Sequence, residues 1–257
     1  MFDIDVPREL KRLIESMRYE ENSIGYSNAR VFHLFDDDKN YYLKIRNSGD
    51  GLRREYEVIN WLKNMLSVPE VLFYADTGEN EYMLSKKIRG EMACSAMYLS
   101  KPEETVKMLA FGISAIRTVK ARDCPFDIRL NNLLDKIKTK IDTDGSQCEN
   151  HAKDDGFASD LELYEYLLRN KPAEPDIAFS HGDYCLPNIM LDANAVSGYL
   201  DFEYAGVADI YQDISSCIWS MEYNFKTDKY NELLFEHLGI PPDWDRVKYY
   251  HLLDKLT

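Results

Sequence analysis

The sequence lacks a long apolar run, a paired cysteine motif and an excess of basic residues. No stretch of its 257 residues is apolar for long enough to cross a bilayer, so no membrane-spanning helix is expected. The five cysteines are scattered, and none forms a Cys-x-x-Cys pair, which excludes a disulfide framework and a cysteine zinc site. Lys and Arg number 31 against 45 Asp and Glu, and a net charge of −14 repels nucleic-acid backbones.

The remaining composition is that of an ordinary globular protein. Hydrophobic residues make up 45% of the chain and charged residues 30%, which excludes disorder for most of it. The first twenty residues carry charges throughout, so no signal peptide is expected, and with unpaired cysteines this predicts a cytoplasmic protein. The acidic balance fits plain solubility and also a cationic partner, and the composition leaves both readings open.

The first part of the chain alternates between strand-like and helix-like patterns. An amphipathic helix is expected within residues 1–20, with Leu10, Leu13, Ile14 and Met17 on its apolar face. Period-two runs predict strands over 30–34, 41–45, 71–74 and 81–85, and a period of three to four predicts a helix over 52–66. Residues 1–88 are therefore predicted to form a sheet-rich N-terminal lobe.

The second part is mainly helical. Helices are expected over about 102–120, 127–140, 161–170, 209–224, 227–238 and 243–255, and short strands over 189–191 and 198–201. Leu163, Tyr164, Leu167 and Leu168 should form the inner face of the helix over 161–170. Residues 89–257 are therefore predicted to form a mainly helical C-terminal lobe, and the whole fold is predicted to be two-lobed and α+β.

The most informative stretch is SHGDYCLPNIM at 180–190. Asp183 begins a loop, where its carboxylate can accept a proton from a substrate hydroxyl. Asn188, five residues on, and Asp201, which ends the next hairpin strand, can supply oxygen ligands of the kind that Mg²⁺ prefers. A Gly-Asp turn needs no function by itself. The agreement of three spacings favours kinase-type phosphoryl transfer.

A strand lysine in the first part supports the same chemistry. Lys44 lies inside the apolar strand 41–45, where its ammonium group needs an anionic partner, and alternation puts Tyr42 on the same face. Kinases place such a lysine on the phosphates and pair it with a helix glutamate. Glu55 borders the buried face of the next helix, while Glu57 competes for the role.

No G-x-G-x-x-G motif precedes this strand. The segment 25–29 occupies the expected hairpin turn instead, where backbone N–H groups and the Ser27 hydroxyl can contact phosphate oxygens. Further along, Asp209 and Asp213 are expected to share one helix face and to support the loop around Asp183 by capping or hydrogen bonding.

Together these residues resemble those of the aminoglycoside phosphotransferases, most closely the 3′-phosphotransferase branch, which are antibiotic kinases with a protein-kinase-like fold. The similar segments run colinearly through nearly the whole chain, at 7–15, 42–44, 61–62, 68–72, 123–125, 148–150, 179–183 and 249–254. The resemblance implies a kinase that transfers the γ-phosphoryl group of ATP or GTP to a hydroxyl, usually the 3′ hydroxyl, of a cationic aminoglycoside. It implies no nucleic-acid or membrane partner.

The resemblance also implies roles, with residues 1–88 as the nucleotide-binding lobe and residues 89–257 as the catalytic and substrate-binding lobe. Asp183 would be the catalytic aspartate, and Asn188 and Asp201 would hold Mg²⁺. The nucleotide site would consist of Lys44 and its partner Glu55 at the phosphates, Tyr42 stacked on the base, Ser27 on a phosphate, and a hinge over 85–88, with Ser85, Lys86 and Ile88 at the adenine edge. The ammonium groups of the acceptor would meet Glu149, Asp254 and the terminal carboxylate of Thr257.

Several positions depart from the 3′-phosphotransferase pattern. Asp201 is followed by Phe202-Glu203-Tyr204 where that branch usually has Gly-Arg, and Trp219 stands at a usual arginine. Ala152 and Lys255 replace acidic residues that would meet the acceptor. The run DFEYA at 201–205 is also similar to choline-kinase-like proteins. Two alternatives therefore stay open: a kinase of a small amino alcohol such as choline, and a catalytically silent nucleotide-binding module.

Overall fold

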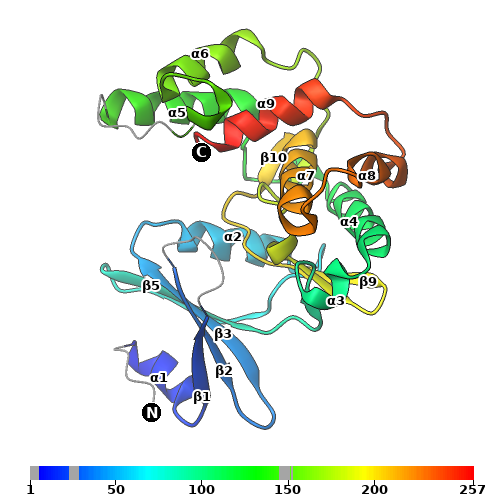
Figure 1. Ribbon diagram of the computed structural model, residues 1–257. Coiled ribbons are helices and arrows are strands. Elements are labelled where there is room, and N and C mark those ends of the chain that lie inside the picture. Colours follow the sequence, from blue (N-terminus) through cyan, green and yellow to red (C-terminus); the bar gives the residue numbers. More distant parts are fainter. Residues whose placement is uncertain (1–5, 23–28, 145–150, 152) are drawn as a thin grey trace. The chain divides into compact units, whose positions relative to one another are not determined.

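The protein, described by a computed structural model, divides into two compact units. The structure describes residues 6–22, 29–144, 151 and 153–257. The first unit comprises Met1–Gly90 together with Ser197–Glu203, and the second comprises Glu91–Val196 together with Tyr204–Thr257. The first unit is rich in strands and the second in helices (Figure 1), so the predicted α+β class is confirmed. None of the helices in the described ranges has the length and apolar character needed to cross a membrane.

Helices and strands follow one another along the chain in this order. The first unit contains α1 (Arg8–Ile14), β1 (Arg18–Asn22), β2 (Arg30–Phe35), β3 (Asn40–Asn47), α2 (Leu52–Leu62), β4 (Val71–Asp76) and β5 (Asn80–Lys86). Then come β6 (Glu91–Met92), α3 (Ala96–Leu99), α4 (Pro102–Ile116), α5 (Leu130–Asp144), α6 (Asp160–Arg169), β7 (Ile177–Ser180), β8 (Ile189–Asp192), β9 (Ala195–Tyr199), β10 (Gly206–Asp209), α7 (Tyr211–Phe225), α8 (Asn231–Leu238) and α9 (Trp244–Asp254).

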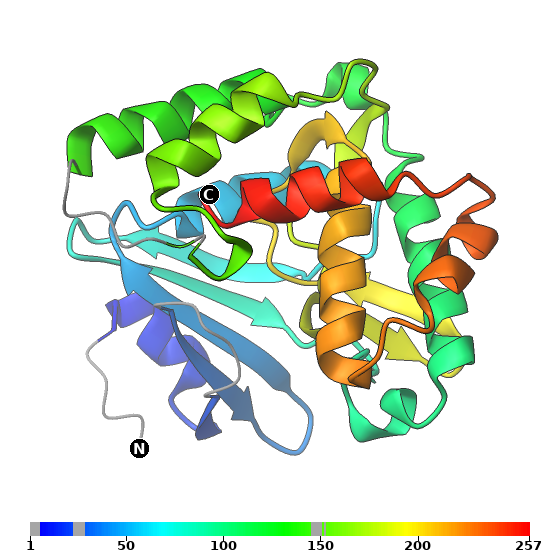
Figure 2. The same ribbon diagram turned by 45° about the horizontal axis from the view of Figure 1, so that its top comes forward.

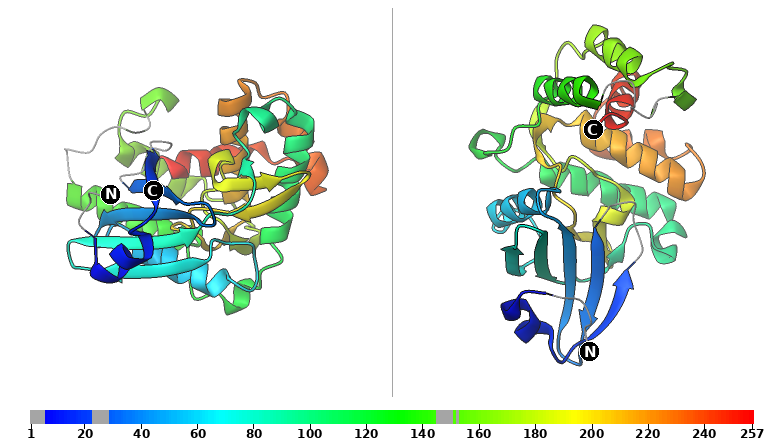
Figure 3. Two further views of the ribbon diagram at one scale, coloured as in Figure 1. Left: turned by 90° about the horizontal axis from the view of Figure 1, so that it is seen from below. Right: turned by 90° about the vertical axis from the view of Figure 1, so that its left-hand side faces the viewer.

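An antiparallel sheet organises the first unit. Among the described residues it has five strands in the order β1-β2-β3-β5-β4. The apolar residues of α1 pack with Leu43 and Ile45 of β3 in one buried cluster. Because side chains alternate across a strand, Lys44 lies on the opposite face, where it contacts α2. The sheet therefore packs an apolar face with α1, and its opposite face has a charged centre that contacts α2. Figure 3 shows the backbone of these strands, in blue to cyan, from two further sides.

The N-terminal helix is shorter than its apolar pattern predicts. It ends at Ile14, Leu13 is 45% exposed, and Arg18–Asn22 forms the edge strand β1 instead of continuing the helix. Met17 closes a turn back to the Ile14 carbonyl and joins the apolar cluster. The residues after Met17 therefore pair with β2 as a strand, although the apolar spacing before them predicts that the helix continues.

Pairs of helices build the second unit. The helices α4 and α8, α7 and α9, and α5 and α6 pack against each other, and Figure 2 shows α7 and α9 crossing. Two short ladders complete it, β7 with β10 and β6 with β8. The strands β6, β7 and β10 were not predicted, since runs of two to four residues have no detectable period. Leu168 was predicted to face inward but is 41% exposed.

Candidate functional site

A three-membered ionic centre lies on the charged face of the sheet in the first unit. Lys44 Nζ donates to Glu55 Oε2 at 2.8 Å and to Asp201 Oδ1 at 3.2 Å. Lys44 comes from β3, Glu55 from α2, and Asp201 from the segment after β9, so the lysine cross-links three elements. Glu57, the competing candidate, pairs with Arg53 on the exposed side of α2. The structure therefore selects Glu55 as the partner of Lys44.

Burial and charge compete at this centre. Burial alone lowers the pKa of Lys44, but the carboxylates of Glu55 and Asp201 more than offset it, so the pKa is raised above the ordinary lysine value. Burial, opposed by Lys44 and reinforced by Asp201, raises the pKa of Glu55. The lysine stays protonated at neutral pH, and one cation faces two carboxylates. An incoming phosphate would compete with Asp201 for the ammonium group.

A second buried ion pair runs beside the first. Arg46, two residues after Lys44 on β3, bonds Glu203, two residues after Asp201, through Nη1 and Oε2. Their side chains are only 13% and 17% exposed. Gly51, with φ +98°, leaves the space for this carboxylate at the start of α2, since an added Cβ would lie 2.0 Å from Glu203 Oε1. Glu203 thus ties the Asp201 segment to β3, and its carboxylate packs beside Gly51 at the start of α2.

Asp201 itself has an unusual backbone. Its φ of +63° lies in the left-handed region, which non-glycine residues seldom adopt. The contact of Asp201 itself with Lys44, and that of Glu203 with Arg46 two residues later, hold the segment in this conformation. Asp201 is 34% exposed at its side chain, so its carboxylate is accessible from solvent while its position is fixed. Backbone strain of this kind is common at functional sites.

The expected base-binding residues line up on adjacent strands. Tyr42 stands opposite Ser85 in the β3–β5 register, and Ser85 is buried. The backbone N–H of Lys86 donates to the Glu70 carbonyl at 2.9 Å, and its Nζ bonds the Glu70 carboxylate. The backbone N–H of Lys86 is therefore already bonded within the first unit.

The side chain of Ile88 packs on Gly198. A Cβ added at Gly198 would lie 2.7 Å from Ile88 Cδ1, so the glycine makes room for the isoleucine. The segment after β5 is therefore held against β9 within the first unit. Ser27, expected at a phosphate, lies outside the described residues.

The loop between β7 and β8 presents Asp183 in the second unit. Asn188 Nδ2 donates to Asp183 Oδ2 at 2.8 Å and to the Asp183 carbonyl at 3.1 Å. Ser216 Oγ on α7 lies 3.4 Å from the other carboxylate oxygen. All three of these contacts come from neutral donors, which orient the Asp183 carboxylate without neutralising it. Sequence reasoning missed Ser216, because nothing along the chain links it to the loop.

Asp213 on α7 holds the base of this loop. Its carboxylate accepts hydrogen bonds from Ser180 Oγ at 2.7 Å and from the backbone N–H groups of His181 and Gly182 at 2.9 Å each. Burial raises the pKa of Asp213, an effect that the charge of His181 and these donors oppose. The predicted supporting role of Asp213 is confirmed. Gly182 has φ +83° and lies against the Tyr204 carbonyl, where an added Cβ would be 2.0 Å away.

Tyr184 anchors the middle of the loop. It is fully buried, and its hydroxyl donates to the Leu109 carbonyl on α4 at 2.9 Å. Gly112 opens the notch that receives the hydroxyl, since an added Cβ would lie 2.1 Å from it. Asp183 is thus held between two buried neighbours, Gly182 and Tyr184, and is itself partly exposed.

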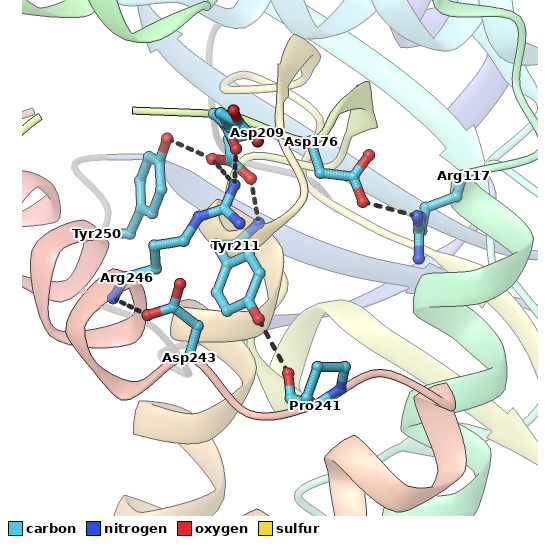
Figure 4. Close-up of polar contacts among 9 residues, drawn as sticks. Arg117, Asp176, Asp209, Tyr211, Pro241, Asp243, Arg246 and Tyr250 are labelled. Atoms are coloured by element: carbon cyan, nitrogen blue, oxygen red, sulfur yellow. Dashed lines mark hydrogen bonds and ion pairs between the residues drawn. The ribbon is translucent and has the colours of Figure 1, made fainter. Parts of the chain in front are cut away.

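Asp209 does not share a helix face with Asp213, contrary to the prediction. It ends strand β10, and α7 begins only at Tyr211. Its carboxylate accepts from Arg246 Nη2 at 2.7 Å, Tyr250 Oη at 3.0 Å and the Tyr211 N–H at 3.1 Å (Figure 4). Arg246 also lies 4.3 Å above the Tyr211 ring. Asp209 therefore fixes α9 to the start of α7, because its two oxygens are shared between the two helices.

The expected acceptor-binding residues lie near the end of α9. Desolvation, with the charge of Asp183 as second cause, raises the pKa of Asp254 to about 6, although the residue keeps exposed surface. Thr257 is exposed and its Oγ1 donates to the Asp254 carbonyl at 3.1 Å. Lys255 pairs with Asp155 at 2.6 Å, so its charge is balanced locally. Glu149 and Ala152 lie outside the described residues.

The two units thus hold two different sets of parts. The first brings together Lys44, Glu55 and Asp201, a cation with two carboxylates. The second brings together Asp183 and Asn188, with Asp254 close enough for its charge to matter. Sequence reasoning missed the link between Arg46 and Glu203. The signal was available, since each lies two residues beyond a predicted member of the ionic centre.

Comparison with known proteins shows similarity along the whole chain. The model of the phosphotransferase enzyme family matches residues 18–250. An aminoglycoside 3′-phosphotransferase of Enterococcus faecalis is 34% identical, with 100% of both chains covered. One of Niallia circulans is 35% identical, over 97% of this chain and 96% of the relative. Another of Staphylococcus aureus is 33% identical over the full length of both.

Solved structures show the same fold at lower identity. An aminoglycoside-3′-phosphotransferase of type VIII superposes with a TM-score of 0.84 at 21% identity, over 97% of each chain. An aminoglycoside phosphotransferase APH(3″)-Id from Streptomyces rimosus, in complex with ADP and streptomycin, gives a TM-score of 0.76 at 22% identity, over 93% of this chain and 92% of that one. The predicted kinase-like fold is confirmed.

Proposed function

Because the chain belongs to the phosphotransferase enzyme family, within its aminoglycoside phosphotransferases, we propose that it transfers the γ-phosphoryl group of ATP to the 3′ hydroxyl of an aminoglycoside. The observation that carries the proposal is the 34% identity, over the full length of both chains, to a relative named as a 3′-phosphotransferase. The ionic centre and the Asp183 loop supply residues of the types that this reaction uses. The enzyme would work in the cytoplasm, where ATP is available.

In this proposal Asp183 orients the acceptor hydroxyl and takes its proton. The hydroxyl oxygen forms a bond to the γ-phosphorus, the bond from that phosphorus to the β–γ bridging oxygen breaks, and ADP leaves. The neutral contacts from Asn188 and Ser216 keep the carboxylate in one orientation. Positioning of this kind supplies most of the rate in phosphoryl transfer.

Lys44 would bind the α- and β-phosphates, with Glu55 holding its ammonium group. Tyr42 would stack on the base, and Ser85, Lys86 and Ile88 would form the hinge, with Ser27 at a phosphate. These assignments rest on the matching motif positions and on the Lys44–Glu55 contact of 2.8 Å.

Mg²⁺ suits the oxygen donors that this chain offers. Asn188 turns its Nδ2 toward Asp183, so the planar amide directs its Oδ1 away from that carboxylate. Asp201 presents a partly exposed carboxylate. Carbonyl and carboxylate oxygens are the ligands that Mg²⁺ takes together with phosphates and water. The ion, when bound, would neutralise charge on the phosphates, and Asn188 and Asp201 are the residues that would hold it.

Asp254, Glu149 and the carboxylate of Thr257 would meet ammonium groups of the acceptor. Two departures from the family pattern, Glu203 and Lys255, suggested a different acceptor, but both side chains are paired within their own unit. Glu203 is engaged with Arg46 inside the first unit, and Lys255 is balanced by Asp155. These contacts favour an aminoglycoside over the small amino alcohol that the DFEYA run suggested.

A panel of acceptors tests the proposal. Purified protein with MgATP would be assayed for ADP release with kanamycin, choline and no acceptor, and the kanamycin product would be mapped by phosphorus NMR. We expect phosphate transfer to the 3′ hydroxyl of kanamycin and none to choline. Transfer only to choline would establish the amino-alcohol alternative, and MgATP binding without transfer to any acceptor would establish a silent module.

A further inference from the structure

A column of three rings stands on the charged face of the sheet in the first unit. His33 on β2 lies between Phe35 of the same strand and Tyr42 of β3. Its ring centre is 4.9 Å from that of Phe35 and 5.0 Å from that of Tyr42, with interplanar angles of 26° and 23°. Both pairs are stacked at distances typical of attractive ring contacts. Because side chains alternate along a strand, this ring column (Phe35, His33 and Tyr42) shares the face of Lys44.

The strand register places the ring column on one side of the expected base site. His33 is paired with Tyr42 across β2 and β3, and Tyr42 is paired with Ser85 across β3 and β5. Since β3 lies between β2 and β5, the imidazole covers the side of the tyrosine ring that faces β2. On the β5 side the row continues with a buried serine, whose side chain is too short to cover a ring. A base on that side would stack on the tyrosine face opposite to His33.

Asn40 connects the ring column with the expected hinge. His33 Nε2 donates to Asn40 Oδ1 at 2.6 Å, because an amide oxygen can only accept. The backbone carbonyl of Asn40 accepts from the Lys87 N–H at 2.9 Å, and Lys87 lies within the hinge over 85–88. One residue thus links the ring that supports Tyr42 to the segment that would meet the edge of the base.

A cation covers the far end of the ring column. The guanidinium carbon of Arg18 lies 4.9 Å from the centre of the Phe35 ring, and the two residues are paired across β1 and β2. His33 is therefore held by a ring on each side and by the Asn40 amide. A tyrosine side chain can turn about two bonds, and a fixed neighbour stacked on one face restricts it to one orientation. A base that binds an already ordered ring loses less conformational entropy.

We propose that His33 is a positioning residue of the nucleotide site, which holds the Tyr42 ring from the β2 side so that the base stacks on its β5 side. The inference rests on the proposed function and deepens its nucleotide half, in which Tyr42 stacks on the base. His33 acts through Tyr42 and touches neither base nor phosphate. Its removal should therefore weaken binding of the base and leave binding of the phosphates at Lys44 unchanged.

Two ligands test the assignment by titration calorimetry. MgATP carries a base and phosphates, whereas magnesium tripolyphosphate carries phosphates alone. We expect His33→Ala to raise the Kd for MgATP about fivefold and to leave that for tripolyphosphate within about 1.5-fold, because only the base depends on Tyr42. His33→Phe keeps a flat ring and should hold both Kd values within about twofold of the wild type. His237→Ala, which removes a partly buried imidazole on α8 in the second unit, is the matched control.

A Tyr42→Leu background separates positioning from general support of the sheet. In that background His33→Ala should change the Kd for MgATP by less than about 1.5-fold, since the residue through which His33 acts is gone. An unchanged Kd for MgATP in His33→Ala would overturn the proposal, as would an equal rise for both ligands or additive effects of the two substitutions. The titrations use no acceptor. If the wild type binds MgATP but phosphorylates no aminoglycoside, the proposed function fails, and these titrations still decide the role of His33.

Discussion

The ionic centre of the first unit and the Asp183 loop of the second hold their carboxylates in opposite ways. Glu55 and Asp201 contact the same buried ammonium group of Lys44. Asp183 contacts an amide and a hydroxyl instead, and the buried Asp213 beneath it takes neutral donors from Ser180 and the loop backbone. One centre contains its own cation, whereas the other leaves a carboxylate for a ligand.

The difference matches the charges that each centre would meet. An anionic nucleotide needs a cation that can bind its phosphates. Lys44 is bonded to two carboxylates, and a phosphate can replace one of them. A cationic acceptor needs carboxylates that no protein cation neutralises. This requirement explains why the Asp183 carboxylate is oriented by dipoles and why Lys255 is drawn to Asp155. The acidic residues behind the net charge of −14 therefore include carboxylates that would meet a cationic acceptor.

Removing the charge of Asp183 should break the second centre most severely. In Asp183→Asn the amide can keep its contact with Asn188, but it cannot take a proton from the acceptor. We expect kcat to fall by about two to four orders of magnitude, while the Kd for MgATP stays within about twofold. Steady-state ADP release and nucleotide titration measure the two quantities. Asp176→Asn, which alters an exposed pair with Arg117 in the same unit, is the control and should keep wild-type kcat.

Filling the space beside Glu203 should loosen the first centre. Gly51→Ala must displace the Glu203 carboxylate, whereas Gly49→Ala meets no atom within 4 Å. Both glycines have positive φ, so both variants carry the same backbone penalty. We expect Gly51→Ala to lose about 1–3 kcal/mol more stability than Gly49→Ala and to raise KM for MgATP. Equal denaturation midpoints for the two variants would show that the Glu203 contact contributes nothing.

The smallest expected effect is a pH dependence at Asp254. Its pKa of about 6 means that the carboxylate gains a proton as pH falls through that value. If it binds an ammonium group, KM for kanamycin should rise about fourfold from about pH 7.5 to about pH 5.5, with kcat less affected. Because the folded pKa lies above the unfolded value, Asp254 itself adds stability as pH falls below 6. Asp254→Asn should flatten the KM profile, and a profile that keeps its slope argues against the assignment.

Local patterns predicted much of the fold and the ionic centre. Alternation in β3 placed Lys44 on the charged face, and helical spacing placed Glu55 at the edge of the buried face, although Glu57 needed the structure for its exclusion. The strand β1 was missed because the apolar helical spacing continues to Met17, where packing against the sheet takes over. Local periodicity cannot report which element a residue will meet.

The Asp183 loop shows the same limit for the candidate site. Ser216 on α7 contacts the Asp183 carboxylate, yet nothing along the chain indicated it. The contact depends on how α7 packs against the loop, which no local pattern reports. Asp213, in contrast, was predictable as a support for the loop, because a buried carboxylate near a turn must find donors.

The dependence of the Asp183 loop on α7 has a consequence for the order of folding. Ser180, Asp183 and Leu186 contact Asp213, Ser216 and Ser220, respectively, and each partner lies 33 or 34 residues further along the chain. A ribosome must therefore complete α7 before the loop can acquire its geometry. Contacts of this separation form late, since closing the intervening chain costs entropy before the bonds are gained. A nascent chain would hold its strand-rich sheet well before it could present an oriented Asp183.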